Sequence, residues 1–147
     1  MQGIVKDNLN RITTSKLLGL YASVVNELRR RRVVRSANNP VADYAESLAI
    51  KALGLKLAPK SAPGYDATDT RGERYEIKGR RLTAHNKPTH FSAIRGLDKE
   101  HLTYLIGVLL GEDFSVLRAA LVPVDVVKEQ ARYRKHINGG CFPCEIA

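Results

Sequence analysis

The sequence has no long hydrophobic run and no recognisable targeting segment. No stretch reaches the roughly 18 apolar residues that a transmembrane helix needs, and residues 1–7 lack the apolar core of a secretory signal. These absences predict a soluble, cytoplasmic protein with no membrane partner. We also find no internal repeat, low-complexity tract or interdomain linker among the 147 residues, so we expect a single domain over residues 1–147.

Cysteine and histidine are too sparse to predict a zinc site within the chain. The two cysteines, Cys141 and Cys144, form a lone Cys-x-x-Cys with no second pair at zinc-ribbon spacing. The histidines also lack a pair at ligand spacing. Glycines before the cysteine motif and a proline inside it favour an irregular tail over residues 138–147. A redox motif would instead sit where a strand leads into a helix.

The sequence is strongly basic. Its 24 lysines and arginines against 15 acidic residues give a formal net charge of +9. Such a charge favours polyanionic partners, because lysine and arginine contact phosphates and release counterions. Basic residues are also common on ordinary protein surfaces, so the charge alone fits a nucleic-acid-binding protein or a solvated surface equally well. The 44% hydrophobic content is enough for one buried core.

Helical spacing of apolar residues predicts a helix over residues 14–33, with Thr13, Thr14 or Ser15 as its N-cap. This helix makes residues 1–38 an N-terminal helical extension. It ends in four arginines, 29–32, which complement the negative end of the helix dipole. The same cluster could contact phosphates, and the sequence leaves both interpretations open.

A second helix is predicted over residues 40–53, because Asn39 and Pro40 favour a helix start and Gly54 favours a stop. Glu46 lies in an otherwise apolar row of this helix. Burying a carboxylate without compensation is costly, so Glu46 needs a cation, a metal or a hydrogen-bonded partner unless it reaches solvent at the boundary of the core.

The acidic residues Asp66 and Glu76 flank a predicted hairpin. Residues 70–72 read as a three-residue loop in which Gly72 adopts the left-handed conformation at little cost. Counting back from this loop places Asp66 opposite Glu76, with Cβ atoms of directly opposed residues roughly 5 Å apart. Strand alternation places Lys78 on the same face of the sheet.

Two facing carboxylates repel each other unless a proton or a cation lies between them. A pair of carboxylate oxygens suits Mg²⁺, which keeps several waters and takes further ligands from substrate phosphate. A lysine beside that metal can hold or deprotonate a water molecule. Asp66, Glu76 and Lys78 therefore indicate phosphodiester hydrolysis.

The remaining elements complete an α/β pattern. Residues 56–59 are a short strand candidate. Further strands are predicted over residues 102–110, which read as a buried strand, and over residues 115–122. Residues 80–97 are basic and polar without clear periodicity, which predicts a functional or partly helical segment. Residues 125–133 have helical character and lead into a basic end.

A helix carrying Glu46, then Gly64-Tyr65-Asp66, a turn and Glu76-Ile77-Lys78 resembles the PD-(D/E)XK nuclease superfamily, over roughly residues 40 to 125. The resemblance implies a restriction-endonuclease-like core, with a central mixed β-sheet flanked by α-helices, inside a catalytic region of residues 39–137. One departure is Gly64-Tyr65-Asp66, where the family name has proline before aspartate. That proline varies in the superfamily.

The resemblance also implies roles for single residues. Asp66 and Glu76 would be metal ligands, Glu46 would complete the metal site directly or through water, and Lys78 would position or activate the attacking water. Arg80 and Arg81 follow directly, so one of them could neutralise phosphate charge while its neighbour faces the core or solvent. The residues expected to bind nucleic acid are Arg80, Arg81, Arg132, Arg134 and Lys135.

Together these observations predict a Mg²⁺-dependent endonuclease that hydrolyses DNA, with Mn²⁺ able to replace Mg²⁺. A type II restriction-like enzyme that cuts both strands of duplex DNA would need two such sites, so a homodimer is expected. Two alternatives stay open. One is a non-catalytic nucleic-acid-binding module in which the same charges form structural ion pairs, and the other is cleavage of RNA or branched DNA at the same site.

Overall fold

The computed structural model describes residues 8–37, 39–59, 61–88, 90–134 and 139–144, with only the backbone of residues 132–134. The chain separates into two compact units, Met1–Pro40 and Val41–Ala147. Residues 1–38 were expected to form a helical extension because a helix was predicted over residues 14–33. That helix lies in the first unit. Among the described residues, no helix is both long and apolar enough to cross a membrane.

The first unit is built around helix α2 (Thr14–Arg30), which begins at Thr13 as N-cap. The helix is three residues shorter at its end than the predicted range of 14–33. It stops because Arg32 has a left-handed φ of 59°, and the N–H of Val33 then reaches back to the carbonyl of Leu28 at 3.0 Å. This closing geometry leaves Arg29 and Arg30 in the last helical turn.

The second unit contains a five-stranded sheet in the order β1-β2-β3-β4-β5. Strands β3 and β4 are parallel, whereas the other neighbouring pairs are antiparallel, so the sheet is mixed. The α/β class with a mixed sheet was predicted and is confirmed. The strands are β1 (Lys56–Leu57), β2 (Ala67–Thr68), β3 (Arg74–Arg81), β4 (Tyr104–Leu110) and β5 (Val116–Pro123).

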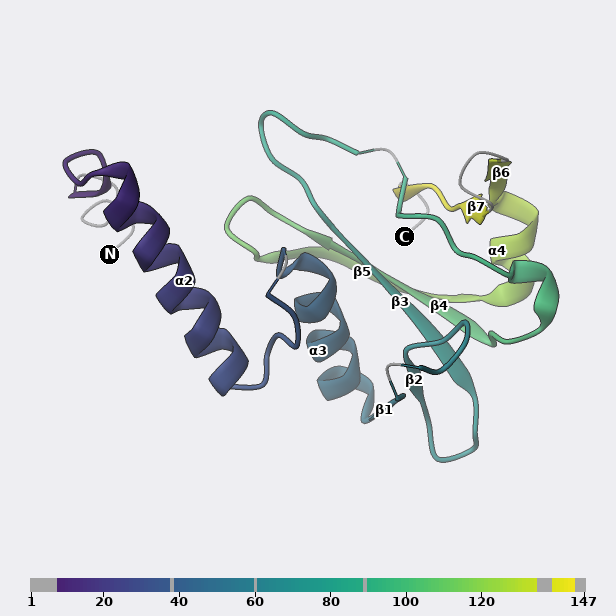
Figure 1. The fold of residues 1–147 in the computed structure, drawn as a ribbon. Coiled ribbons are helices and arrows are strands. Elements are labelled where there is room, and N and C mark those ends of the chain that lie inside the picture. Colours follow the sequence, from purple (N-terminus) through teal and green to yellow (C-terminus); the bar gives the residue numbers. More distant parts are fainter. Residues whose placement is uncertain (1–7, 38, 60, 89, 135–138, 145–147) are drawn as a thin grey trace. The chain divides into compact units, whose positions relative to one another are not determined.

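Helix α3 (Val41–Leu53) covers one face of the sheet (Figure 1). It begins one residue after the predicted start at 40 and ends at the predicted residue 53, before Gly54. Its Ala45 and Ala49 are buried against odd-numbered residues of β3 and even-numbered residues of β4. Because neighbouring side chains alternate between faces, these residues form one apolar layer: Tyr75, Ile77, Ile106, Val108 and Leu110.

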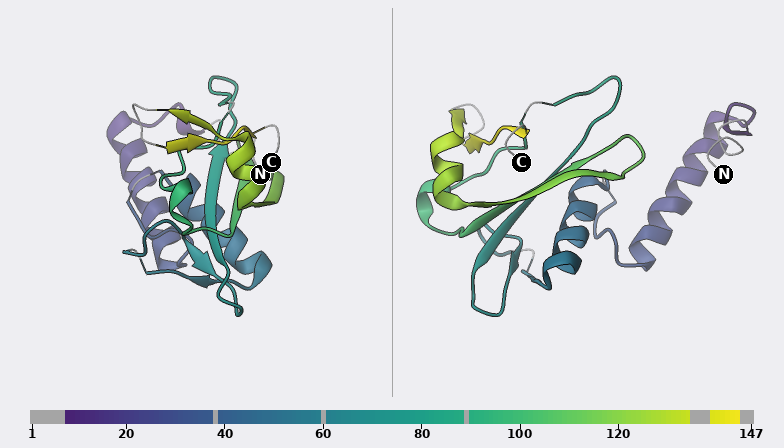
Figure 2. Two further views of the ribbon diagram at one scale, coloured as in Figure 1. Left: turned by 90° about the vertical axis from the view of Figure 1, so that its right-hand side faces the viewer. Right: turned by 180° about the vertical axis from the view of Figure 1, so that it is seen from behind.

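The opposite face is covered by helix α4 (Val124–Gln130) and a two-stranded ribbon of β6 (Arg132–Arg134) and β7 (Gly139–Cys141) (Figures 1 and 2). Its core contains Leu105 and Leu109 from β4, and residues that lie far along the chain. The largest fully buried side chains on this face are Phe91, Phe142, Leu105 and Val127.

Two sequence predictions near the C-terminus were wrong. The helix expected over 125–133 ends at Gln130, because Ala131 is extended and residues 132–134 pair with β7 instead. The tail 138–147, expected to be irregular, contains β7 and two buried cysteines. The packing around Gly140 is close, since a Cβ there would lie 2.7 Å from Leu97 Cδ1 and 3.1 Å from the Cβ of Ala131.

Residues 82–96 leave the end of β3 and turn back across the face of the sheet that carries α4 (Figure 1). Within the described part of the chain this segment has no helix before the 3₁₀ turn η1 (Leu97–Lys99). It is held by the ribbon instead, because Ile94 and Gly140 exchange backbone hydrogen bonds of 2.9 and 3.0 Å. This crossing segment becomes the wall of the site described below.

Gly79→Ala is expected to lower the free energy of unfolding of the second unit by about 1–3 kcal/mol. A Cβ at this position would lie 2.7 Å from the Cβ of Ala45 and 3.0 Å from the carbonyl oxygen of Val41, so α3 would have to move away from β3. Thermal unfolding measures the effect. Gly19→Ala is the control, because nothing lies within 4 Å of its added Cβ; equal melting temperatures for Gly79→Ala and the parent would contradict the close packing.

Candidate functional site

The hairpin between β2 and β3 has the register that the loop predicted. Ala67 pairs with Tyr75, and Gly72 has the expected left-handed φ of 82°. The turn is reinforced by Asp69, whose carboxylate accepts the backbone N–H of Arg71 at 2.9 Å. A short loop with its own side-chain hydrogen bonds fixes the strand pairing locally, so this part of the site follows from the sequence.

Asp66 lies one residue before β2 and is bonded to β3 through both its backbone and its side chain. Its N–H donates to the carbonyl of Tyr75 at 2.7 Å, and its Oδ2 accepts the N–H of Ile77 at 2.7 Å. Because β2 begins only at Ala67, the Asp66 carboxylate takes the place of a backbone carbonyl as the acceptor for the Ile77 N–H. This bond holds the Asp66 carboxylate against the strand segment between Glu76 and Lys78.

Glu76 and Lys78 lie on the sheet face opposite to the buried residues Tyr75 and Ile77. Lys78 Nζ is 2.6 Å from Glu76 Oε1, and the two side chains are only 18% and 13% exposed. Charges that lie in partial burial attract or repel more strongly than charges in open water. Glu76 and Lys78 therefore share one face of the sheet, and Asp66 lines the same cleft as these two residues.

The pKa of Asp66 is raised from 3.8 to about 6. Burial is the largest cause, and repulsion from the Glu76 carboxylate adds to it. The hydrogen bond from Ile77 and the ammonium of Lys78 act in the opposite direction but do not outweigh burial. Asp66 therefore takes up a proton more readily than a carboxyl group in open water.

Glu46 lies in the middle of α3, half-buried. Its negative charge is among the causes that raise the pKa of Asp66, so it acts on the site electrostatically. Among the described residues, no three Asp, Glu, His or Cys side chains lie close enough to hold one metal ion together. A metal at this site would have Asp66 and Glu76 as its protein ligands, and Mg²⁺ is often held by one or two carboxylates together with water and phosphate.

An open cleft of about 650 Å³ is lined by Asp66, Glu76, Lys78 and Arg80, whereas Glu46 is not among its lining residues. The Nε of Arg80 donates to the carbonyl of His90 at 3.0 Å, which ties the guanidinium to the crossing segment. Three further lining residues come from that segment and were not among the predicted site residues, because only the tertiary fold brings residues 82–96 over β3. They are Ser92, Ala93 and Arg95.

The sequence did not decide which of Arg80 and Arg81 faces the site, and the structure separates them. Arg81 lies on the other face of β3, with its guanidinium 4.6 Å from the centre of the Phe114 ring. It also donates two hydrogen bonds to the carbonyl of Glu112. Arg81 therefore packs against the loop after β4, and Arg80 is the arginine beside the carboxylates.

The other residues expected to bind nucleic acid lie in the C-terminal ribbon or beyond the described chain. Arg132 and Arg134 belong to β6 and not to a helical end, and the structure describes only their backbone. Lys135 lies outside the described residues. Their predicted role in binding stays a prediction.

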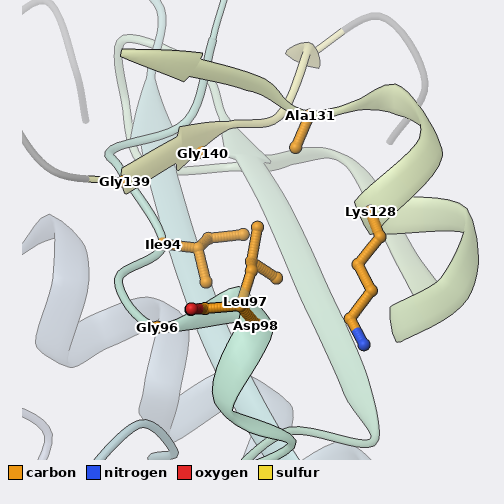
Figure 3. A pocket seen from close by; sticks show the side chains of 8 residues that line it. All are labelled: Ile94, Gly96, Leu97, Asp98, Lys128, Ala131, Gly139 and Gly140. Carbon is orange, nitrogen blue, oxygen red and sulfur yellow. The ribbon is translucent and has the colours of Figure 1, made fainter. Parts of the chain in front are cut away.

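A second cavity of about 600 Å³ is lined by residues of the crossing segment, η1, α4 and β7 (Figure 3). Ile94 and Leu97 point into it, whereas Arg95 lines the first cleft. The charged ends of Asp98 and Lys128 lie at its sides (Figure 3). This second cavity lacks the paired carboxylates of the first, so the first cleft is the candidate site.

Comparison with known proteins adds no family assignment. No protein-family model matches the chain, and a search of curated proteins found no match. The function is therefore argued from the geometry of the cleft.

Proposed function

We propose that this chain is a divalent-metal-dependent endonuclease that hydrolyses DNA phosphodiester bonds at the cleft around Asp66, Glu76 and Lys78. The observation that carries the proposal is the bond from the Ile77 N–H to Asp66 Oδ2 at 2.7 Å, which fixes one carboxylate beside a second carboxylate and a lysine. The α/β fold with a mixed sheet is compatible with the restriction-endonuclease-like core that the sequence resembles.

In this proposal Asp66 and Glu76 would hold Mg²⁺ or Mn²⁺, and Glu46 would complete the metal site directly or through water. When bound, the metal lowers the pKa of a water molecule and polarises a phosphate oxygen. The chain supplies the rest. Its two carboxylates form the part of the cleft that would attract the cation.

Lys78 is proposed to orient the attacking water. Its ammonium lies 2.6 Å from Glu76, so a water molecule that it holds would be beside the carboxylates. Arg80 is proposed to hold a phosphate oxygen, because its Nε is already tied to His90 and its terminal amino groups remain to donate. A guanidinium that is positioned beforehand stabilises developing negative charge without reorganisation.

Duplex DNA is the proposed substrate, because a basic chain attracts a polyanion; RNA and branched DNA are the alternatives at the same site. Hydrolysis of both strands requires two sites, so we propose a homodimer, with a type II restriction-like enzyme as one form of it. The test is cleavage of duplex, single-stranded and branched DNA and of RNA with Mg²⁺, Mn²⁺ or EDTA. Metal-dependent cleavage that EDTA abolishes is expected. Absence of cleavage of every substrate with both metals would overturn the proposal.

A non-catalytic nucleic-acid-binding module is the second candidate. The observation that favours it is the ion pair between Lys78 and Glu76, which in that case would be purely structural. The two candidates differ in metal binding: the module predicts that Mg²⁺ leaves the stability of the second unit unchanged, whereas the nuclease predicts an increase.

Arg80 and Arg81 provide a matched pair of variants. Arg80→Gln is expected to lower the cleavage rate at least tenfold, because it removes the charge beside the carboxylates, and to lower stability by about 1 kcal/mol, because it loses the hydrogen bond to the carbonyl of His90. Arg81→Gln is expected to lower stability by about 1 kcal/mol and leave the rate unchanged, because it loses the contact with Phe114. Single-turnover cleavage and thermal unfolding separate the two effects; the reverse pattern would exclude Arg80 from the site.

A further inference from the structure

The positive charge of the chain is concentrated in its first unit. Residues 1–40 contain eight of the 24 lysines and arginines but only two of the 15 acidic residues, so they carry +6 of the net charge of +9. The second unit, with 16 basic and 13 acidic residues, is nearly balanced although it contains the candidate catalytic cleft. Most of the attraction to a polyanion therefore originates outside the unit that contains that cleft.

Five arginines at the end of α2 form the densest part of this charge, and we name them the arginine cluster: Arg29, Arg30, Arg31, Arg32 and Arg35. Stabilising the helix end does not account for all of them. Only Arg29 and Arg30 lie in the last turn, where cations interact favourably with the helix dipole. Arg31 is the C-cap residue, and Arg32 lies beyond it in a left-handed conformation.

Glu27 positions two members of the cluster. Its carboxylate accepts hydrogen bonds from Arg30 Nη2 at 2.7 Å and from Arg31 Nε at 2.7 Å. Bonding to Arg30 and then to Arg31 lowers the pKa of Glu27 to about 2, so one negative charge stays among five positive ones at neutral pH. Within the described residues, the exposed side chains of Arg29 and Arg32 have no ion-pair partner.

The distribution of charge favours a nucleic acid over a membrane surface. An interfacial helix carries lysines and arginines along its whole polar face. The described polar face of α2 has Lys16 near one end and is otherwise uncharged until Glu27. The charge is instead a compact group at the helix end, and all five members are arginines, whose planar guanidinium groups match phosphate oxygens in pairs.

We propose that the arginine cluster is a docking surface for the phosphate backbone of duplex DNA, separate from the cleft that contains Asp66 and Glu76. The inference rests on the proposed function for its choice of substrate, but it concerns binding and not cleavage. The cluster holds the duplex without reading its sequence, because phosphate contacts carry no base information. The cleft then acts on DNA that is already bound.

The test is binding of a fluorescent 20-base-pair duplex to the full chain in EDTA, measured by anisotropy at several salt concentrations. The double variant Arg29→Gln/Arg32→Gln removes the two arginines without a partner. Its log-log salt slope is expected to be smaller by about 1.8, since each phosphate contact contributes roughly 0.9. Its affinity at 0.1 M salt is expected to be tens of times weaker for every duplex sequence.

The matched control is Arg11→Gln/Lys16→Gln, which removes the same charge at the other end of α2, where both side chains are exposed. Its slope is expected to stay close to that of the parent. Equal losses in the two double variants would show that the charge acts diffusely and would overturn the proposal, provided that circular dichroism shows equal helix content.

Two further readouts identify other failures. If Arg29→Gln/Arg32→Gln loses binding to phosphatidylserine vesicles but keeps the DNA slope of the parent, the partner is a membrane and the proposal is wrong. If the slope falls as expected but no DNA is cleaved with Mg²⁺ or Mn²⁺, the docking surface stands and the nuclease function fails. If DNA is cleaved but Arg29→Gln/Arg32→Gln keeps the salt slope of the parent, the nuclease function stands and the docking surface is wrong.

Discussion

Replacing Lys78 with alanine is expected to slow DNA cleavage by about 10²- to 10⁴-fold, the usual contribution of a group that positions or transfers a proton. The substitution removes the ammonium that lies 2.6 Å from Glu76 and leaves both carboxylates in place. Binding of a divalent cation should persist or become tighter, because Lys78 is a positive charge that lowers the pKa of Asp66 and competes with a metal for the same oxygens.

Single-turnover cleavage at saturating Mg²⁺ and fixed salt measures this effect. Lys56→Ala serves as the control, since it removes an exposed lysine from β1 and should leave the rate unchanged. A Lys78→Ala variant that cleaves as fast as the parent under these conditions would rule out the proposed role. Lys78→Arg should restore the charge but little of the rate, because a guanidinium places its donors differently from an ammonium.

Asp66→Asn is expected to abolish metal-dependent cleavage and, without metal, to stabilise the second unit by about 1–3 kcal/mol at pH 8. The pKa of Asp66 rises from 3.8 to about 6 on folding, and each unit of pKa corresponds to about 1.4 kcal/mol. Asparagine has no charge to bury, and its side-chain oxygen can still accept the N–H of Ile77. Loss of function should therefore accompany a gain in stability.

The gain should depend on pH in a defined direction. A raised carboxyl pKa means that the folded parent binds its proton more tightly than the unfolded chain does. The stability from this group is fully present below pH 3.8 and is lost as pH rises through about 6. The advantage of Asp66→Asn should consequently be absent near pH 3.8, grow between pH 4 and 6, and stay constant above that range.

Urea unfolding followed by the near-ultraviolet circular dichroism of tyrosine suits this measurement, because Tyr75 and Tyr104 stack at 5.3 Å inside the second unit. Asp69→Asn is the matched control in the same hairpin. The pKa of Asp69 is lowered, since hydrogen bonds from Glu73 and Arg71 outweigh the effect of burial, so Asp69→Asn should reduce stability. A destabilised Asp66→Asn variant at pH 8 would contradict the account of the site.

The hairpin and α3 are the parts of the fold that the sequence predicted best. Both are specified by neighbours along the chain: a three-residue loop ending in Gly72 sets the register of β2 with β3, and Gly54 ends α3 where predicted. Asp66, Glu76 and Lys78 come together for the same reason. A local turn and the alternation of a strand are enough to place them on one face of the sheet.

Elements that depend on distant contacts were predicted less well. The C-terminal segment reads as irregular because of its glycines, yet it forms β7 and buries Phe142. Its neighbour β6 replaces the predicted end of a helix. The two strands pair with each other, and Gly140 of β7 also exchanges backbone hydrogen bonds with the distant Ile94. Local propensity is a weak guide when tertiary packing supplies such hydrogen bonds.

The sequence by itself determined which residue types the candidate site contains: two acids, a lysine and a following pair of arginines. Their order along one hairpin fixes which side chains share a face. Only the tertiary structure decided that Arg80 and not Arg81 faces the cleft, and that Ser92 and Arg95 form its opposite wall. Those choices depend on where residues 82–96 cross the sheet, and that path is fixed by burial of Phe91 and by backbone bonds to β7. No pattern in neighbouring residues encodes such contacts.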